Sequence, residues 1–345
     1  MYKKSYYKVA IIGLGYVGLP LYMLIKNKNI EVYGLDNDQT KVNLLNKNIS
    51  TNSDIPSYRL KAIKNKNIFN IDKKNIIKNW NVVIFCLPTP ITKNDKPDLS
   101  YIKKAFDKIK NQISKDTLLI LESTVYPGAT REIFGNYIKK NYANFNDINF
   151  GFSSERISPG QIGHKYKIKY QDITKVLSIN DLKFKNKIQN FYRIFFKKTH
   201  LADTLEIAEM SKLLENSYRS VNIGLINEIK KICINSNLDI HKVIEAAATK
   251  PFGFTAFTPG PGVGGHCIPI DPVFVSWFAK KSNTNSNLID LARKINLETT
   301  SWVYSNITKI IENSKKNKIL ILGITYKENI NDYRESPALK IIKSL

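Results

Sequence analysis

Short apolar runs alternate with helix-like segments along the first 150 residues of the chain. The strand-like runs are Val9–Ile12, Glu31–Leu35, Val82–Leu87, Leu118–Glu122 and Ile148–Phe152. This alternation predicts an α/β domain with a Rossmann-like, doubly wound parallel sheet, because parallel strands need helical crossovers. Ligands of such sheets bind beyond the carboxyl ends of the strands.

The apolar spacing changes to a helical period after about residue 203. Asp203–Asn235 contains no proline, and its apolar residues recur every three or four positions, which predicts one long helix. A helix longer than ~25 residues typically joins domains or forms a dimer core. Further helices are expected over Leu238–Ala248, Val273–Lys281 and Leu288–Ile311. A last apolar run, Lys318–Gly323, and a helix after Pro337 predict the start of a second Rossmann-like domain.

The first strand is followed by a glycine-rich turn, Gly13-Leu-Gly-Tyr-Val-Gly18, then a helix, a second strand and Asp36. This order matches a dinucleotide-binding fingerprint. Gly13 makes the tight turn, Gly15 lets a pyrophosphate approach, and Gly18 lets the helix pack on the strand. The helix N-terminus offers N–H groups to phosphates. Asp36 would bind the ribose hydroxyls and repel a 2′-phosphate, so we predict NAD rather than NADP.

A second glycine-dense segment, Gly260–Pro272, places Cys267 ahead of a predicted helix, with Asp271 as N-cap and Pro272 as the first helical residue. Glycines let a ligand approach the backbone, and a helix N-terminus favours a thiolate. Cys267 is therefore a candidate nucleophile. The alternative is a structural cysteine beside a tight turn.

Three strand ends carry distinctive residues: Pro88–Pro90, Ser123–Gly128 and Ser153–Arg156. Each alone is also typical of a turn, but carboxyl ends of parallel strands meet at one edge of a sheet, so we expect a cleft there. On the long helix, Lys212 and Asn216 are four residues apart and share one face. Taken alone, that pair is better explained as a solvated face.

The 345-residue chain has 53 basic and 29 acidic side chains and a formal charge of +24. Such a charge is typical of nucleic-acid-binding proteins, but the lysines are scattered through Lys/Asn/Ile-rich stretches, as AT-rich coding would produce. We therefore expect no nucleic-acid partner. The sequence has no apolar stretch of the ~18 residues that a membrane span needs. Three cysteines without paired spacing predict no disulfide framework and no metal site, and hence a reducing, cytoplasmic location.

Together these motifs resemble the UDP-glucose/GDP-mannose dehydrogenase family, and within it the UDP-N-acetylglucosamine (N-acetylhexosamine) 6-dehydrogenases. The resemblance covers essentially the whole chain and rests on the fingerprint and on Glu122–Gly128, Ser154–Arg156, Lys212–Asn216, Gly264–Asp271 and Tyr326–Lys327. His266 and Ile268–Asp271 stand where UDP-glucose enzymes usually have Ser and a Phe-Pro-Lys-Asp run. The family usually has Pro in place of Ser154 and an acidic residue in place of Gln161.

The resemblance implies an NAD-dependent four-electron oxidation of a UDP-sugar at C6, through a thiohemiacetal and a thioester on Cys267, for surface polysaccharide biosynthesis. The implied catalytic residues are Cys267, Lys212, Asn216, Asp271, Glu155 and Thr124. The implied cofactor contacts are Gly13, Gly15, Tyr16, Val17, Gly18, Asp36, Thr89, Thr124, Lys327 and Arg334. The implied substrate contacts are Glu155, Arg156, Lys212, Asn216, Phe254, Phe257, Gly262, Gly264 and Gly265.

The resemblance also implies three regions: an NAD-binding domain over 1–200, a helical dimerisation domain with the cysteine loop over 201–312, and an incomplete UDP-binding domain over 313–345. A complete last domain needs about 80 to 100 further residues, so we expect a C-terminally truncated chain. A homodimer through the long helix is expected. Two alternatives stay open: a UDP-glucose 6-dehydrogenase, and a weakly active or non-catalytic remnant that still binds NAD and dimerises.

Overall fold

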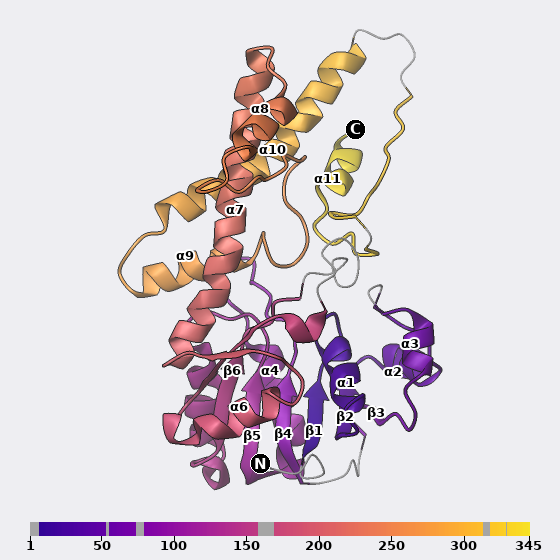
Figure 1. The fold of residues 1–345 in the computed structure, drawn as a ribbon, viewed down its shortest axis with the longest axis vertical. Coiled ribbons are helices and arrows are strands. Elements are labelled where there is room, and N and C mark those ends of the chain that lie inside the picture. The colour runs from indigo at the N-terminus through magenta and orange to yellow at the C-terminus, as the bar shows by residue number, and fades with distance from the viewer. Residues whose placement is uncertain (1–6, 53–54, 74–78, 158–168, 313–317, 329) are drawn as a thin grey trace. The chain divides into compact units, whose positions relative to one another are not determined.

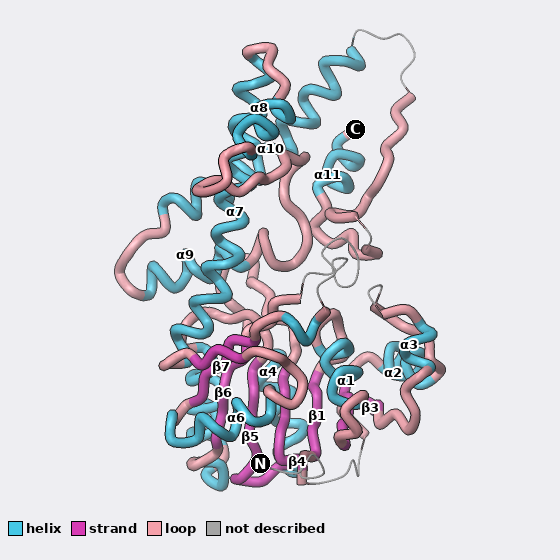
Figure 2. Tube along the Cα trace, in the orientation of Figure 1, coloured by secondary structure: helices cyan, strands magenta, loops and turns pink. Residues whose placement is uncertain are grey.

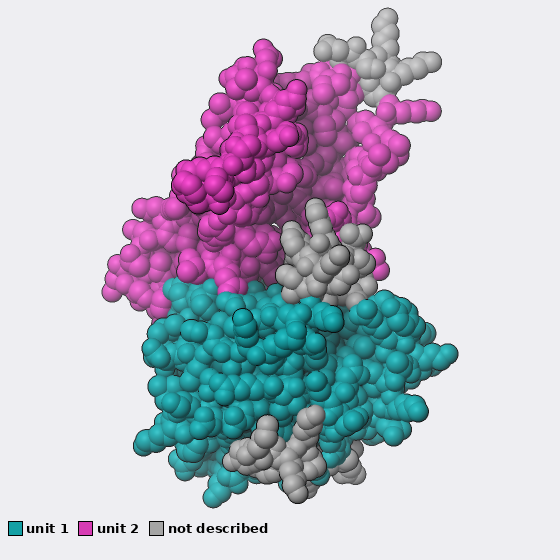
Figure 3. Space-filling view, in the orientation of Figure 1, with its two compact units in different colours: residues 1–212 teal, residues 213–345 magenta. Residues whose placement is uncertain are grey.

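The computed structural model describes residues 7–52, 55–73, 79–157, 169–312, 318–328 and 330–345. Gln161, one of the departures from the family pattern, lies outside these residues. The chain divides into two compact units, Met1–Lys212 and Leu213–Leu345 (Figure 3). Each unit is described by itself below.

The first unit is built on an eight-stranded sheet with the strand order β3-β2-β1-β4-β5-β6-β7-β8 (Figures 1 and 2). Its strands are β1 (Lys8–Ile12), β2 (Glu31–Asp36), β3 (Ile68–Asn70), β4 (Trp80–Phe85), β5 (Ile113–Leu121), β6 (Asn149–Ser153), β7 (Lys175–Ile179) and β8 (Thr199–Leu201). Neighbouring strands are parallel except for β6 and β7, which are antiparallel. The prediction of a largely parallel, doubly wound sheet is therefore confirmed.

Strand register brings the carboxyl ends of the parallel strands to one edge of the sheet. Ile12 lies opposite both Leu35 and Phe85, and Phe85 lies opposite Leu121. Leu121 in turn lies opposite Phe152. Because β7 runs antiparallel to β6, the first residue of β7 lies at this same edge. The residues that follow β1, β2, β4, β5 and β6 therefore lie along the same edge of the sheet as the start of β7.

Helices cover the sheet of the first unit. They are α1 (Gly18–Lys26), α2 (Gln39–Asn46), α3 (Ser57–Lys61), α4 (Ser100–Ile109), α5 (Ile138–Asn141) and α6 (Lys185–Tyr192). Helix α1 packs on β1 and β2, and α6 packs on β7 and β8. The core between them is apolar: Ile11, Ile84 and Ile120 from the central strands are fully buried together with Leu19 of α1. Burial of this kind is the main favourable term in folding.

The helical region has the elements that the periodicity predicted. They are α7 (Leu205–Asn235), α8 (Ile240–Ala248), α9 (Asp271–Lys281) and α10 (Asn287–Glu312), followed by α11 (Pro337–Ser344). In the second unit, α10 comes so close to α7 that a Cβ on Gly224 would lie 3.3 Å from the Ala292 carbonyl oxygen. The glycine that interrupts the apolar pattern of α7 thus permits close packing of the two helices.

The apolar run Lys318–Gly323 was expected to form the first strand of the last domain, and this prediction is wrong. The structure has no strand in the described residues 318–328. Leu320 and Leu322 are 82% and 86% exposed. A strand forms by pairing its backbone groups with a neighbour, and in the described part of the chain none lies beside this run. The helix that was predicted after it is present as α11.

No helix among the described residues has the length and apolarity needed to cross a membrane. Within the same residues, no group of three or more His, Cys, Asp or Glu side chains is arranged to hold a metal ion.

Candidate active site

The glycine-rich turn after β1 has a separate geometric reason for each of its glycines. Gly13 has a φ of +92°, and a Cβ there would lie 2.5 Å from the Cys86 carbonyl oxygen. A Cβ on Gly18 would lie 1.8 Å from the Gly13 carbonyl oxygen, whereas Gly15 has no other atom within 4 Å of its Cβ position. Gly13 and Gly18 are therefore required by packing. Gly15 leaves the space that a pyrophosphate would need.

Asp36 ends β2 beside this turn and is buried. Its Oδ2 accepts the Leu14 N–H at 2.8 Å and the Lys41 ammonium at 3.0 Å, while Oδ1 accepts the Asp38 N–H at 3.0 Å. An ionised carboxylate has about four acceptor sites, so this fixed group can still accept a ribose hydroxyl. The turn and Asp36 together fit NAD; Tyr16 and Val17 are half-buried within the same turn.

The segments after β4 and β5 are tied together by hydroxyl groups. Ser123 Oγ donates to the Leu87 carbonyl at 2.6 Å and accepts the Leu87 N–H at 3.0 Å. Thr89 Oγ1 donates to the Thr124 carbonyl at 2.6 Å. Thr89 is buried, and Thr124 is half-buried. Both threonines that the resemblance assigns to the cofactor are therefore held at one edge of the sheet.

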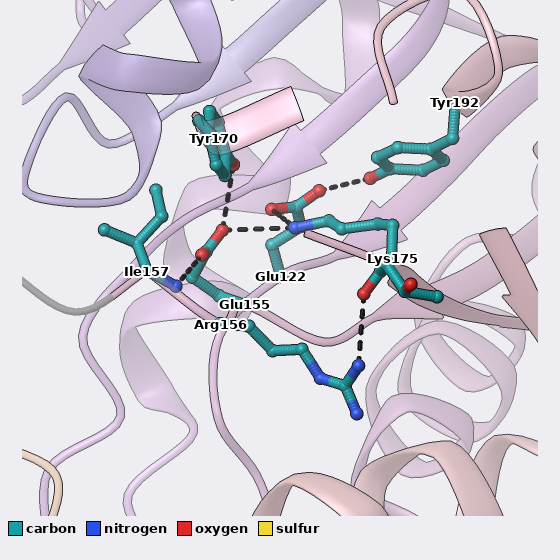
Figure 4. A network of polar contacts seen from close by, with 8 residues as sticks. Glu122, Glu155, Arg156, Ile157, Tyr170, Lys175 and Tyr192 are labelled. Carbon is teal, nitrogen blue, oxygen red and sulfur yellow. Dashed lines mark hydrogen bonds and ion pairs between the residues drawn. The ribbon is translucent and has the colours of Figure 1, made fainter. Parts of the chain in front are cut away.

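Glu155 follows β6 at this edge and is almost fully buried. Its Oε1 accepts the Ile157 N–H, and its Oε2 accepts the Tyr170 hydroxyl at 3.0 Å and the Lys175 ammonium at 3.1 Å (Figure 4). The next residue, Arg156, donates from Nη1 to the Thr174 carbonyl at 3.1 Å. Glu155 is thus fixed from three sides.

Lys175, the first residue of β7, also pairs with a second buried carboxylate. Its ammonium lies 2.9 Å from Oε2 of Glu122, which follows β5, and the Tyr192 hydroxyl donates to Oε1 of Glu122 (Figure 4). Burial raises the pKa of Glu122, although the Lys175 charge opposes the rise. Burial also acts to raise the pKa of Glu155, but Lys175, the Ile157 N–H and Lys212 outweigh it and lower that pKa below its ordinary value. The two carboxylates therefore differ in their affinity for a proton.

Helix α7 is anchored to the segment after β5 by Glu209. The Glu209 carboxylate accepts the Gly128 N–H at 2.6 Å and the Thr130 N–H at 2.8 Å. Burial raises the pKa of Glu209 to about 7. Three positions further along the helix, Lys212 is 9% exposed and acts electrostatically on Glu155. This arrangement directs Lys212 toward the charged cluster.

In the second unit, Asn216 and Asp271 form a buried pair. Asn216 Nδ2 donates to Asp271 Oδ2 at 2.5 Å. The predicted N-cap role of Asp271 is wrong: α9 begins at Asp271 itself, and Ile270 holds the N-cap position without a side-chain cap.

Cys267 is exposed at the turn that leads into α9. Its carbonyl oxygen accepts the Asp271 N–H at 2.8 Å and the Ile270 N–H at 3.1 Å, so the backbone of the turn is fixed. The three cysteines all lie in the described part of the chain, and none belongs to a disulfide.

The glycines before Cys267 pack against other parts of the second unit. A Cβ on Gly265 would lie 2.7 Å from the Tyr326 ring, and one on Gly264 would lie 2.6 Å from the Tyr326 Cβ. A Cβ on Gly262 would lie 2.5 Å from Thr300 Oγ1. Close packing of the loop therefore requires glycine at these three positions, independently of any ligand.

The remaining predicted contacts of the second unit lie in different settings. Phe257 packs edge-on against the Tyr218 ring, with 6.0 Å between ring centroids, and Phe254 is 40% exposed. The Arg334 guanidinium is held by Asp332, with Nη2 at 2.7 Å from Oδ2. Lys327 is half-buried. None of these placements by itself assigns a ligand.

Sequence reasoning missed Lys175, Tyr192 and Glu209 as parts of the site. For Lys175 a signal was present: it is a charged residue at the start of the apolar run Lys175–Ile179, and every residue of this run is buried. A buried ammonium needs a charged or polar partner, so such a lysine indicates a carboxylate nearby. The sequence does not show which carboxylate that is.

Comparison with known proteins matches three successive segments of the chain to domains of one family. The family model for the UDP-glucose/GDP-mannose dehydrogenase NAD binding domain matches residues 7–196, that for the central domain matches 206–298, and that for the UDP binding domain matches 320–345. A UDP-N-acetyl-D-glucosamine 6-dehydrogenase of Pseudomonas aeruginosa is 34% identical, over 98% of this chain and 80% of its own. A UDP-N-acetyl-D-mannosamine dehydrogenase of Methanocaldococcus jannaschii is 35% identical, over 98% of this chain and 76% of its own.

Solved structures agree with these matches. The UDP-D-ManNAc dehydrogenase of Pyrococcus horikoshii has a TM-score of 0.86 and 29% identity, over 98% of this chain and 80% of that one. The UDP-N-acetyl-mannosamine dehydrogenase Cap5O of Staphylococcus aureus has a TM-score of 0.82 and 30% identity, over 98% of this chain and 79% of that one.

Proposed function

Because the chain belongs to the UDP-glucose/GDP-mannose dehydrogenase family and is an NAD-dependent nucleotide-sugar dehydrogenase, we propose that it oxidises C6 of a UDP-N-acetylhexosamine to the uronic acid. The observation that carries this choice of sugar is the similarity, over 98% of the chain, to dehydrogenases named for UDP-N-acetylglucosamine and UDP-N-acetylmannosamine. Oxidation of an alcohol to a carboxylate removes four electrons.

The residues proposed to hold NAD are the turn Gly13–Gly18, Asp36, Thr89 and Thr124. Lys327 and Arg334 are proposed as cationic contacts to the cofactor phosphates. NAD, when bound, supplies the oxidant by accepting one hydride in each of two successive rounds. The open space at Gly15 supports the placement of the pyrophosphate at this turn.

Cys267 is the proposed nucleophile for the second half of the reaction. Its thiolate adds to the C6 aldehyde and gives a thiohemiacetal, and oxidation of that adduct leaves a thioester. Water then adds to the thioester carbon, the C–S bond breaks, and the carboxylate leaves. The exposure of Cys267 on a fixed turn ahead of α9 supports this role.

Lys212 and Asn216 are the proposed stabilisers of negative charge on the reacting oxygen. Asp271 fixes the Asn216 amide by accepting one of its two N–H groups, which leaves the other to donate to an oxyanion. Glu155 and Thr124 are proposed to position the hydrolytic water. The proposed substrate contacts also include Arg156, Phe254, Phe257, Gly262, Gly264 and Gly265.

We further propose a homodimer that forms through α7. Leu214, Tyr218, Leu225 and Ile232 are each at least half exposed on this helix. Their spacing of four, seven and seven residues places them on one face, as in a coiled-coil seam. An exposed apolar stripe of this kind is typical of a protein–protein contact.

The proposed location is the cytoplasm, because a catalytic thiol must stay reduced. The product keeps its UDP leaving group and remains a donor for glycosyl transfer, which supports a role in surface polysaccharide biosynthesis.

The decisive experiment measures NADH release by the purified protein with a panel of UDP-sugars. We expect two NADH per sugar, with UDP-N-acetylglucosamine or UDP-N-acetylmannosamine preferred over UDP-glucose. A preference for UDP-glucose would make the protein a UDP-glucose 6-dehydrogenase. Release of one NADH per sugar would contradict the thioester mechanism.

A further inference from the structure

We propose that Lys175 and Glu122 are positioning residues for Glu155: Lys175 holds the Glu155 carboxylate ionised, and Glu122 fixes the Lys175 ammonium beside it, so that Glu155 accepts the proton of the water that hydrolyses the Cys267 thioester. This inference rests on the proposed function. It assigns a role to two buried charges that the residues carried over from the family leave unused.

The geometry places Lys175 between two carboxylates. Its ammonium lies 2.9 Å from Glu122 and 3.1 Å from Glu155, and all three side chains are at least nine-tenths buried (Figure 4). They come from three neighbouring strands, β5, β6 and β7. Only the antiparallel direction of β7 brings its first residue to the edge where β5 and β6 end.

The groups that face Glu155 and Glu122 fix where a proton goes. Tyr170, Tyr192 and Cys86 have pKa values held well above their ordinary values, chiefly by burial, so they stay neutral. Among the described residues, the charged groups that act on the two carboxylates, besides each other, are Lys175 and, at Glu155, Lys212. Of the carboxylates, Glu122 has a raised pKa and Glu155 a lowered one. A proton taken up by the cluster is therefore favoured on Glu122, and Glu155 stays a base.

Glu155 retains room for a water molecule. From the described part of the chain, three donors reach its oxygens: the Lys175 ammonium and the Tyr170 hydroxyl at Oε2, and the Ile157 N–H at Oε1. About four acceptor sites exist on a carboxylate, so these three donors leave one site at Oε1. In hydrolysis, the proton of a water held there moves to Glu155. The water oxygen bonds to the thioester carbon, and the C–S bond breaks to release the Cys267 thiolate.

A purely structural role of Lys175 and Glu122 predicts changes in stability, whereas a positioning role predicts changes in the protonation of Glu155. Replacing a buried ion pair by uncharged groups is often neutral for stability, whereas removing one partner leaves a buried charge unpaired. Removing Lys175 deprives Glu155 of the ammonium bonded to it and leaves only the weaker influence of Lys212. Removing the charge of Glu122 leaves Lys175 to Glu155 alone. Positioning therefore predicts opposite effects on the protonation of Glu155.

The experiment compares Lys175→Met, Glu122→Gln and the double variant with the wild-type chain, using UDP-N-acetylglucosamine and NAD. We expect Lys175→Met to move the acidic limb of the kcat pH profile up by at least about one pH unit, a tenfold change in proton affinity. Glu122→Gln should leave this limb in place or move it down. Intact-mass analysis should show a covalent sugar adduct on Cys267 accumulating in Lys175→Met, because hydrolysis rather than oxidation is slowed.

Lys187→Met is the matched control, since Lys187 is a half-buried lysine of α6 that donates to the Asp116 carbonyl at 2.7 Å. It should keep the wild-type profile. If Lys175→Met does not fold, the double variant replaces it and should show the same upward shift. The inference would be overturned if the acidic limb of the kcat profile did not move in Lys175→Met. It would also be overturned if turnover of this variant slowed without a covalent adduct on Cys267. If the wild type itself releases one NADH per sugar, the proposed function fails and this inference falls with it.

Discussion

At the scale of single residues, the first unit buries carboxylates in three different ways. Glu155 faces an ammonium and several N–H and O–H donors, and its pKa is lowered. Glu122 shares the same ammonium but is dominated by burial, and its pKa is raised. Glu209 accepts two backbone N–H groups and, within the residues that the structure describes, no hydrogen bond from a cation, and burial raises its pKa to about 7. Similar side chains thus acquire different proton affinities from their neighbours.

Glu209 leads to a prediction about stability and pH. Its pKa of about 7 in the folded chain exceeds the ordinary value of 4.5, so the folded state binds the proton more tightly. The stability that this proton provides is present below about pH 4.5 and is lost as the pH rises through about 7. Urea unfolding of the wild type and of Glu209→Gln, which cannot titrate, should show Glu209→Gln gaining up to about 3 kcal/mol relative to the wild type between pH 5 and pH 8. A constant difference between the two across this range would contradict the assignment.

Cys267 leads to a prediction about catalysis. Cys267→Ser replaces the proposed nucleophile by a hydroxyl that does not ionise near neutral pH, so the proposed thioester cannot form. We expect overall turnover to two NADH to fall by at least about a thousandfold, with NAD affinity within about twofold of the wild type. Stopped-flow NADH release and an NAD titration measure the two quantities. Cys233→Ala, at a buried position of α7, is the control and should retain turnover.

The sequence could identify residues whose role depends on local geometry. Gly13, Gly18 and Asp36 lie within 24 positions of one another, and their spacing alone predicted the turn that the structure contains. Lys175 could not be assigned in this way. Its partners lie 20 and 53 positions away, on strands whose relative direction no local pattern fixes.

At the scale of elements, long segments with a clear apolar period were predicted well. Very short strands, and strands whose formation depends on pairing with a distant neighbour, were not. Helix α7 and the strands of the parallel core follow from apolar spacing. The strands β3 and β8 have three residues each, too short for a period to be recognised. Conversely, Lys318–Gly323 has the composition of a strand but forms none, because pairing with a neighbour and not composition makes a strand.

The glycines of the turn after β1 give a prediction that separates NAD binding from stability of the fold. Gly15→Ala adds a Cβ in open space, so the free energy of unfolding should stay within about 1 kcal/mol of the wild type. The same Cβ would occupy the proposed pyrophosphate position, and we expect NAD binding to weaken at least about tenfold. Gly18→Ala places a Cβ 1.8 Å from a backbone oxygen and should instead destabilise the fold by about 3 kcal/mol or more. Calorimetric NAD titration and urea unfolding of both variants separate the two effects.

At the scale of the whole molecule, α7 continues from the first unit into the second within one helix. Lys212 and Asn216 lie on either side of the division, one turn apart. Lys212 acts electrostatically on Glu155 of the first unit, and Asn216 is bonded to Asp271 of the second.

The apolar stripe of α7 gives the prediction for the assembly. In a two-fold symmetric dimer each substitution counts twice, and burying a leucine stabilises by about 2 kcal/mol. Leu225→Lys should therefore raise the dimer dissociation constant about a thousandfold and give a monomer in sedimentation velocity at micromolar concentration. Tyr58→Lys changes an exposed aromatic residue on α3, outside the stripe, and should leave the wild-type dimer intact. A wild-type chain that sediments as a monomer would contradict the proposed dimer. A Leu225→Lys chain that stays dimeric would move the interface to another surface.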